Sequence, residues 1–178
     1  MTDRLGKGVA MDMLEVIKTR RSIRRYTGDP ISEEDINKIL EAGRWAPSAD
    51  NSQPWAFVVL RSLEVRKRLA AVLPWGGFLS QAALGIAVII DEAASSHAVE
   101  DGAAATQNVL LEAHSLGLGA CWIGTYSSPH EASAKKVLKV PEDKRLLSVI
   151  AIGRPAETAR RTRKPLAELV FTDQYGRR

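Results

Sequence analysis

Three short apolar runs constrain the fold of this chain more than any other feature. Residues 55–60, 84–90 and 146–152 are each of strand length and show no regular alternation of polar and apolar residues. Such runs are typical of strands that are covered on both faces. Because segments with helical spacing separate them, the sequence predicts an α+β fold with a small mixed or antiparallel central sheet flanked by helices.

The helical segments carry recognisable start and stop signals. Ser32, with Asp35 three residues later, predicts a helix start, and Pro47 should end that helix. Asp12 is an N-cap candidate for a short helix whose apolar face would be formed by Met13, Val16 and Ile17. Further helices are expected over residues 62–73, 98–116 and 129–138, the longest of them ending at the 117–119 Gly-Leu-Gly sequence.

Length and composition favour one soluble domain. The 178 residues carry a formal net charge of +4, and no apolar run is long enough to span a bilayer. We expect a loose tail over residues 1–10 and a single domain over 11–178, in which 153–178 form an arm with little core of its own. Cys121 is the only cysteine; we expect it to be buried and inert, and the lack of disulfides favours a cytoplasmic location.

The segment 19–26 offers the clearest candidate for a binding site. It reads TRRSIRRY and places Arg20, Arg21, Ser22 and Arg24 directly after the first predicted helix. Guanidinium groups and a hydroxyl are suited to a phosphate. Taken alone, the segment could equally be a solvated basic helix end, where cations favour the helix dipole. A second basic cluster lies at 160–164.

The loop 46–55 offers short hydrogen-bonding side chains between two prolines. Ser48, Asn51 and Gln53 are its candidate ligand contacts, although prolines around polar residues also describe a plain turn. No dinucleotide-binding fingerprint and no P-loop are present, and the three histidines lack metal-ligand spacing. His114, on the long predicted helix, is interpreted as a structural residue.

Three stretches together resemble the nitroreductase family of FMN-dependent oxidoreductases. They are residues 20–24, residues 46–55 and the sequence GLGACWIG at 117–124, and the resemblance extends over about residues 14–170. It implies an intertwined homodimer with FMN at the interface. It also implies ping-pong hydride transfer from NADH or NADPH through the flavin N5 to a nitroaromatic, a quinone or a similar acceptor, without a metal, nucleic acid or membrane partner.

The same resemblance implies which residues contact the flavin. In the family, the positions of Arg20, Arg21, Ser22 and Arg24 all contact FMN, and Arg24 would lie near the N1 and O2 edge and tune its potential. No side chain is assigned as a catalytic acid or nucleophile, because the chemistry belongs to FMN. The complete set of implied cofactor contacts is Arg20, Arg21, Ser22, Arg24, Pro47, Ser48, Asn51, Gln53, Trp122, Ile123, Gly124, Arg161 and Arg163.

Other functions remain open at the level of sequence. Where longer relatives carry an insertion with extra helices, this chain has only the short segment 95–100 at the beginning of its long helix, so it resembles a short, minimal member. A reductive dehalogenase, a flavin-consuming enzyme or a flavin sensor without turnover would share the FMN motifs. A basic nucleic-acid binder is the alternative outside this family. For Trp45, Trp75 and Trp122 we expect plain packing rather than stacking on a ligand.

Overall fold

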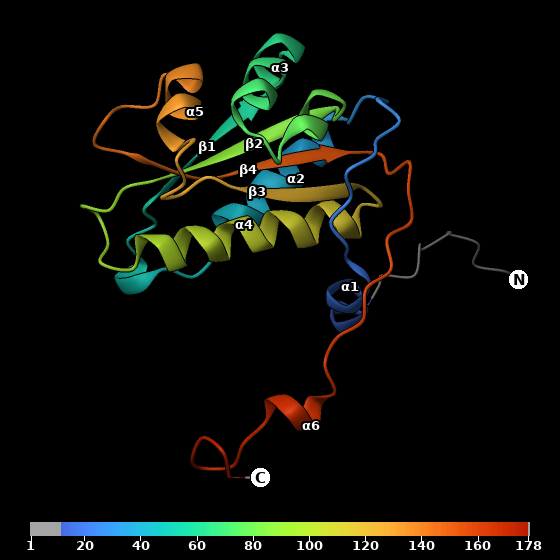
Figure 1. Ribbon diagram of the computed structural model, residues 1–178, viewed down its shortest axis with the longest axis vertical. Helices are drawn as coiled ribbons and strands as arrows, with labels where there is room; N and C mark the ends of the chain where they lie inside the picture. The colour runs from blue at the N-terminus through green and yellow to red at the C-terminus, as the bar shows by residue number, and fades with distance from the viewer. Residues whose placement is uncertain (1–11, 178) are drawn as a thin grey trace, which may run out of the picture.

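The computed structural model describes residues 12–177 and contains one antiparallel sheet of four strands (Figure 1). The strands are β1 (Trp55–Leu60), β2 (Leu84–Ile90), β3 (Gly119–Gly124) and β4 (Arg145–Gly153). Their order across the sheet is β1-β2-β4-β3, so β2 and β4 are central; β2 is buried throughout and β4 is buried after Arg145. This confirms the predicted α+β class with a small central sheet.

Helices cover both faces of the sheet (Figure 1). On one face lie α2 (Glu33–Arg44) and α4 (Ala98–Ser115), and on the other lie α3 (Leu63–Val72) and α5 (Glu131–Leu138). The side chains of β2 alternate accordingly: Ile86 and Val88 pack in the cluster with α2 and α4, whereas Ala87 and Ile89 pack in the cluster with α3 and α5. An apolar run without alternation is therefore explained by cover on both faces.

Local signals account for where the helices begin. The Ser32 hydroxyl accepts a hydrogen bond from the Asp35 amide at 3.1 Å, which confirms the predicted N-cap of α2. Asp12 occupies the predicted N-cap position of α1 (Met13–Thr19), but its side chain makes no capping hydrogen bond. Of the apolar face predicted for α1, only Val16 is buried, while Met13 and Ile17 stay exposed in the single chain.

Two strands differ from the sequence-based expectation. Among the described residues, β1 is an edge strand with β2 as its one neighbour. Its side chains pack in both core clusters, but most of its residues are only half-buried, so the predicted cover on both faces is partial. β3 was not predicted as a strand at all, because Gly119, Ala120 and Gly124 give its sequence little strand character. It pairs with β4 from Gly119 opposite Gly153 to Gly124 opposite Ser148.

After β4 the chain leaves the sheet as an exposed arm (Figure 1). The arm contains the short helix α6 (Leu166–Leu169), in which no residue is buried. Along residues 12–177, no helix combines the length and the apolar character that crossing a membrane requires. The loose tail expected at 1–10 lies outside the described residues.

Candidate functional site

The basic segment 19–26 is pinned along one edge of the sheet. Ser22 forms an isolated parallel bridge with Ala120 of β3, and the Ile23 amide donates to the Ala120 carbonyl at 3.0 Å. Tyr26 forms an antiparallel bridge with Pro155, just after β4. These two pairings fix the backbone of the segment between the start of β3 and the end of β4.

Two glycines make this close approach possible. Gly119 and Gly153 are register partners on β3 and β4. A Cβ added at Gly119 would lie 2.8 Å from the Cβ of Ile23, and one added at Gly153 would lie 2.8 Å from Cδ1 of Tyr26. The buried side chains of Ile23 and Tyr26 therefore rest directly on the two glycines. Arg24 and Arg25 between them are exposed, whereas Arg20 and Arg21 before them are half-buried.

The segment and the arm together form a basic hollow, which we call the arginine pocket. Its volume is about 320 Å³. The pocket is lined by Arg20, Arg21, Ser22, Arg24, Glu157, Ala159, Arg161 and Arg163. The structure thus brings the four candidate residues of the first motif together with both tail arginines named from the sequence.

The electrostatics of the arginine pocket favour an anion. Burial, followed by repulsion from Arg163 and Arg21, lowers the pKa of Arg20 below its ordinary value. The buried Nε of Arg21 has no hydrogen-bond partner among the described residues, although its Nη1 donates to the Lys18 and Arg20 carbonyls. A phosphate would satisfy such an orphaned donor and offset the repulsion between the guanidinium groups.

Glu157 is a residue of this pocket that the sequence analysis missed. Its carboxylate accepts a hydrogen bond from the Arg24 amide at 2.6 Å and so ties the arm to the basic segment. It could have been noticed as the only acidic residue between Gly153 and Lys164. It makes a structural contact to the backbone, leaving the Arg24 side chain free to reach outward.

The side chain of Arg24 connects the pocket to the outer end of β3. Its guanidinium carbon lies 5.9 Å from the ring centroid of Phe78, in the 3₁₀ turn Gly77–Ser80. Gly76, just before that turn, faces β3, since a Cβ built there would lie 3.3 Å from Cδ1 of Ile123. Trp122, Ile123 and Gly124 occupy the last half of this edge strand; Ile123 is buried and Gly124 is exposed.

The loop over residues 48–53 has a strained backbone. Asp50, Asn51 and Gln53 have φ values of 51°, 55° and 48°, a left-handed conformation that is unusual for residues other than glycine. The Ser48 hydroxyl accepts from the Gln53 amide at 2.9 Å, and the side-chain amide of Gln53 donates to Asn51. Strained backbone of this kind is concentrated at functional sites.

Within one chain, this loop and the arginine pocket lie far apart. The Ala49 amide of the loop donates to Asp101 near the start of α4, whereas Thr19, before the pocket, is bonded to His114 near the end of α4. At 1.5 Å of rise per residue, Asp101 and His114 are about 20 Å apart along the helix. Gln53 lines a different hollow, between α2 and β1, and Pro47 is exposed beside the same loop.

Cys121 is buried, and its burial raises the pKa of the thiol, as predicted for an inert residue. Trp45 and Trp75 are 71% and 76% exposed, so the expectation that they pack in the protein is wrong for the single chain. Within residues 12–177, no group of three or more His, Cys, Asp or Glu side chains is arranged to hold a metal ion.

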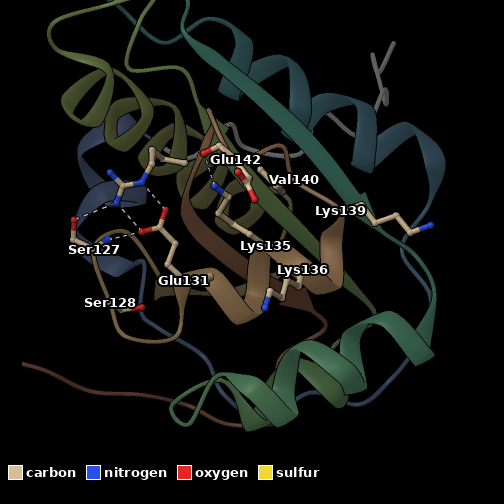
Figure 2. Close-up of a pocket in the computed structure, with 10 residues that line it drawn as sticks. Ser127, Ser128, Glu131, Lys135, Lys136, Lys139, Val140 and Glu142 are labelled. Atoms are coloured by element: carbon tan, nitrogen blue, oxygen red, sulfur yellow. Dashed lines mark hydrogen bonds and ion pairs between the residues drawn. The ribbon is translucent and has the colours of Figure 1, made fainter.

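Another hollow, beside α5, contains none of the predicted site residues. It measures about 680 Å³ (Figure 2). Its polar end is closed by Glu131, which accepts from Arg145 and from two backbone amides. Figure 2 shows that Lys135, Lys136 and Lys139 point in different directions, so they do not converge on one ligand. We therefore assign the site to the arginine pocket.

The fold and the pocket define a class: an α+β protein with an arginine-lined pocket, suited to an anion, beside the edge strand β3. The Nitroreductase family model matches residues 17–76 and 72–154, and the chain therefore belongs to the nitroreductase family. A protein of Methanothermobacter thermautotrophicus, named as a candidate NADH dehydrogenase/NAD(P)H nitroreductase, is 42% identical over 85% of this chain and 82% of its own length.

Solved structures agree with this assignment. A candidate NADH dehydrogenase/NAD(P)H nitroreductase from Bacteroides thetaiotaomicron has a TM-score of 0.88 and 35% identity, covering 92% of this chain and 98% of its own. A candidate nitroreductase from Desulfovibrio desulfuricans, solved in complex with FMN, has a TM-score of 0.80 and 37% identity, covering 92% and 97%. The family resemblance inferred from the three sequence stretches is thus confirmed.

Proposed function

We propose that this protein is an FMN-dependent NAD(P)H oxidoreductase that reduces a small acceptor such as a nitroaromatic or a quinone. The observation that carries the proposal is the arginine pocket, which is lined by Arg20, Arg21, Arg161 and Arg163 and in which the buried Nε of Arg21 has no partner among the described residues. Relatives support it by name: an NADPH-flavin oxidoreductase of Vibrio harveyi and an FMN reductase of Bacillus subtilis are each 30% identical over most of this chain.

The residues present fit FMN. The arginine pocket would hold the phosphate, with Ser22 as an additional donor, because guanidinium groups bind phosphate bidentately. When bound, FMN supplies the hydride chemistry. Arg24, which reaches from the pocket toward Phe78, would place a cation at the edge of the ring, and the outer edge of β3 at Trp122–Gly124 would offer backbone groups.

We further propose that each flavin site is shared between two copies of the chain. The 48–53 loop lies near the start of α4 and the arginine pocket near its end, about 20 Å away along the helix, which is too far for one flavin to be gripped by both in one chain. The buried Ser52 hydroxyl has no partner among the described residues, as expected for a loop that meets a further group. A homodimer would bring the loop of one chain to the pocket of the other.

The exposed arm would form part of this homodimer. Leu166, Leu169 and Val170 are exposed in the single chain, and so are Met13 and Ile17 of α1. The unpaired edge of β1 lies beside a hollow of about 660 Å³ that includes Leu40 and Phe57. We propose that the arm of one chain covers this hollow on the other. A cytoplasmic location remains a prediction from the sequence.

The first test is spectroscopic. The protein purified from its expression host should be yellow, release FMN on denaturation, and oxidise NADH or NADPH in the presence of a nitroaromatic or quinone. A colourless protein that binds no added FMN would overturn the proposal. In that case a DNA affinity that falls steeply with salt would support the nucleic-acid alternative.

Turnover separates the remaining alternatives. A protein that binds FMN but oxidises neither NADH nor NADPH with any acceptor would be a flavin sensor. Release of halide from a halogenated aromatic would indicate a reductive dehalogenase instead. Loss of FMN itself during turnover would indicate a flavin-consuming enzyme.

A further inference from the structure

Asp101 is a buried carboxylate that the proposed FMN contacts do not include. It lies in the first turns of α4 and is only 6% exposed. One carboxylate oxygen accepts from the Ala49 amide at 3.1 Å, and the other accepts from the Ser95 hydroxyl at 2.8 Å. Because a buried charge is costly unless it is well hydrogen-bonded, its position here calls for an explanation.

The carboxylate is fixed in orientation by the turn that precedes α4. The Ser95 hydroxyl, which donates to Asp101, also accepts from the His97 amide at 3.0 Å. The carboxylate oxygen that does not face Ser95, Oδ1, is therefore directed at Ala49, the first residue of the 3₁₀ turn Ala49–Asn51. The bond therefore joins the rigid start of the longest helix to the start of the strained loop.

The 48–53 loop has few other connections to the domain. The hydrogen bonds described for its Ser48, Asn51, Ser52 and Gln53 groups run within the loop itself. Three of its residues have positive φ values, which an unanchored chain would leave readily. An anchor at Ala49 is thus placed where it can hold the whole loop in shape.

We propose that Asp101 is a positioning residue that keeps the 48–53 loop in its flavin-binding conformation. This inference rests on the proposed function, because it assigns the loop to the flavin. Asp101 itself does not touch the cofactor in this account; it acts through the Ala49 amide. The role is geometric, so an uncharged group of the same shape should perform it.

Three variants separate positioning from general stability. Asp101→Ala removes the anchor, whereas Asp101→Asn keeps an oxygen for the Ala49 amide and an amide group facing Ser95. Thr106→Val is the matched control, because Thr106 is also fully buried on α4 and its hydroxyl is bonded to Ser148 and Gly102, away from the loop. Each apoprotein is titrated with FMN by fluorescence quenching, its melting temperature is recorded, and the absorption spectrum is measured at saturating FMN.

We expect Asp101→Ala to weaken FMN binding roughly tenfold and to change the spectrum of the bound flavin, as the loss of one well-placed hydrogen bond would. Asp101→Asn should bind FMN within about threefold of the unsubstituted protein. Thr106→Val should lower the melting temperature and leave FMN affinity unchanged. If Asp101→Ala does not fold, Ser95→Ala, which frees the carboxylate to turn, should show a smaller loss of affinity in the same direction.

Different results would overturn the inference. Unchanged FMN affinity in Asp101→Ala, or in Ser95→Ala if that variant replaces it, would show that the anchor does not matter. An equal loss in Thr106→Val would reduce the effect to general destabilisation, and an equal loss in Asp101→Asn would assign the role to charge rather than geometry. Failure of the unsubstituted protein to bind FMN would instead overturn the proposed function, so the two failures are distinguishable.

Discussion

At the scale of single residues, the arginine pocket brings several like charges close together. Five guanidinium groups share it with one carboxylate, Glu157, and that carboxylate is engaged by the Arg24 amide. The lowered pKa of Arg20, caused by burial and then by Arg163 and Arg21, records the cost of this crowding. A dianionic phosphate would offset the repulsion between the guanidinium groups, and each charged hydrogen bond that it accepts would contribute about 1.5–3 kcal/mol.

Arg24 gives the first residue-scale prediction. Arg24→Ala should make the potential of the bound flavin more negative by about 20–40 mV, equivalent to ~1–2 kcal/mol for a two-electron couple, because a cation that stabilises the reduced ring is lost. Reduction of the flavin by NAD(P)H should slow in parallel. Spectroelectrochemical titration and stopped-flow absorbance measure the two effects. Arg25→Ala is the control, since Arg25 is exposed and lines no described part of the arginine pocket.

His114 gives a second prediction, which concerns pH. Burial, then Arg20 and Arg21, lower the pKa of His114 below its ordinary value of 6.5. The unfolded chain therefore takes up a proton before the folded chain does, and stability falls as pH drops through about 6.5 and levels off below the folded-state pKa. Because His114→Gln has no imidazole to protonate at this position, its unfolding free energy should fall less than that of the unsubstituted protein between about pH 7 and pH 5. Chemical denaturation of both proteins across that range provides the comparison, and identical slopes would contradict the expectation.

At the scale of elements, the sequence predicted what depends on local pattern. The runs at 84–90 and 146–152 are central strands, and Ser32 caps α2 as expected. β3 could not be found this way, because its place depends on pairing with β4 rather than on its own small residues. Similarly, an apolar run does not show how completely a strand is covered, and most residues of the edge strand β1 are only half-buried.

For the candidate site, the sequence predicted which residue types bind the ligand but not how the structure separates them. The residue types of the first motif and of the tail indicated an anion, and the structure brings them into one pocket. The separation of the 48–53 loop from that pocket depends on the length of α4 and was invisible in the sequence. The anchor at Asp101 was also missed, because the pairing of Asp101 with Ala49 joins residues far apart in the chain.

Gly119 supports a prediction at this scale. Gly119→Ala should displace the basic segment from β3, because the new Cβ would meet Ile23 Cβ at 2.8 Å. We expect a loss of about 1–3 kcal/mol in unfolding free energy, typical of overpacking, and weaker FMN binding. Gly77→Ala is the control, since a Cβ there would meet nothing within 4 Å and its φ is not positive. Urea denaturation and FMN titration give both quantities; equal behaviour of the two variants would contradict the role of Gly119.

At the scale of the whole molecule, the proposed function depends on two chains. The arm, the exposed apolar residues of α1 and the unpaired edge of β1 are all features that a monomer leaves uncovered. In the proposed homodimer, the 18-residue helix α4 would separate the 48–53 loop, bonded to Asp101 near its start, from the arginine pocket beside His114 near its end. A site divided in this way makes a specific prediction about mixed dimers.

Complementation between two defective chains tests the divided site. One chain carries Arg20→Ala with Arg21→Ala, and the other carries Ser48→Ala with Asn51→Ala. Each homodimer should bind FMN poorly. A heterodimer purified through two different tags should bind about one FMN per dimer, because one of its two sites combines an intact pocket with an intact loop. Equilibrium dialysis measures the stoichiometry.

The matched control reverses the expectation. A heterodimer of the unsubstituted chain with a chain carrying all four substitutions has no intact site if pocket and loop act across the interface, and one intact site if they act within a chain. FMN binding in the first heterodimer and not in the second therefore supports a shared site. The opposite pattern would place both motifs of each site on one chain, and would require the separation along α4 to be bridged by a conformation other than the one described.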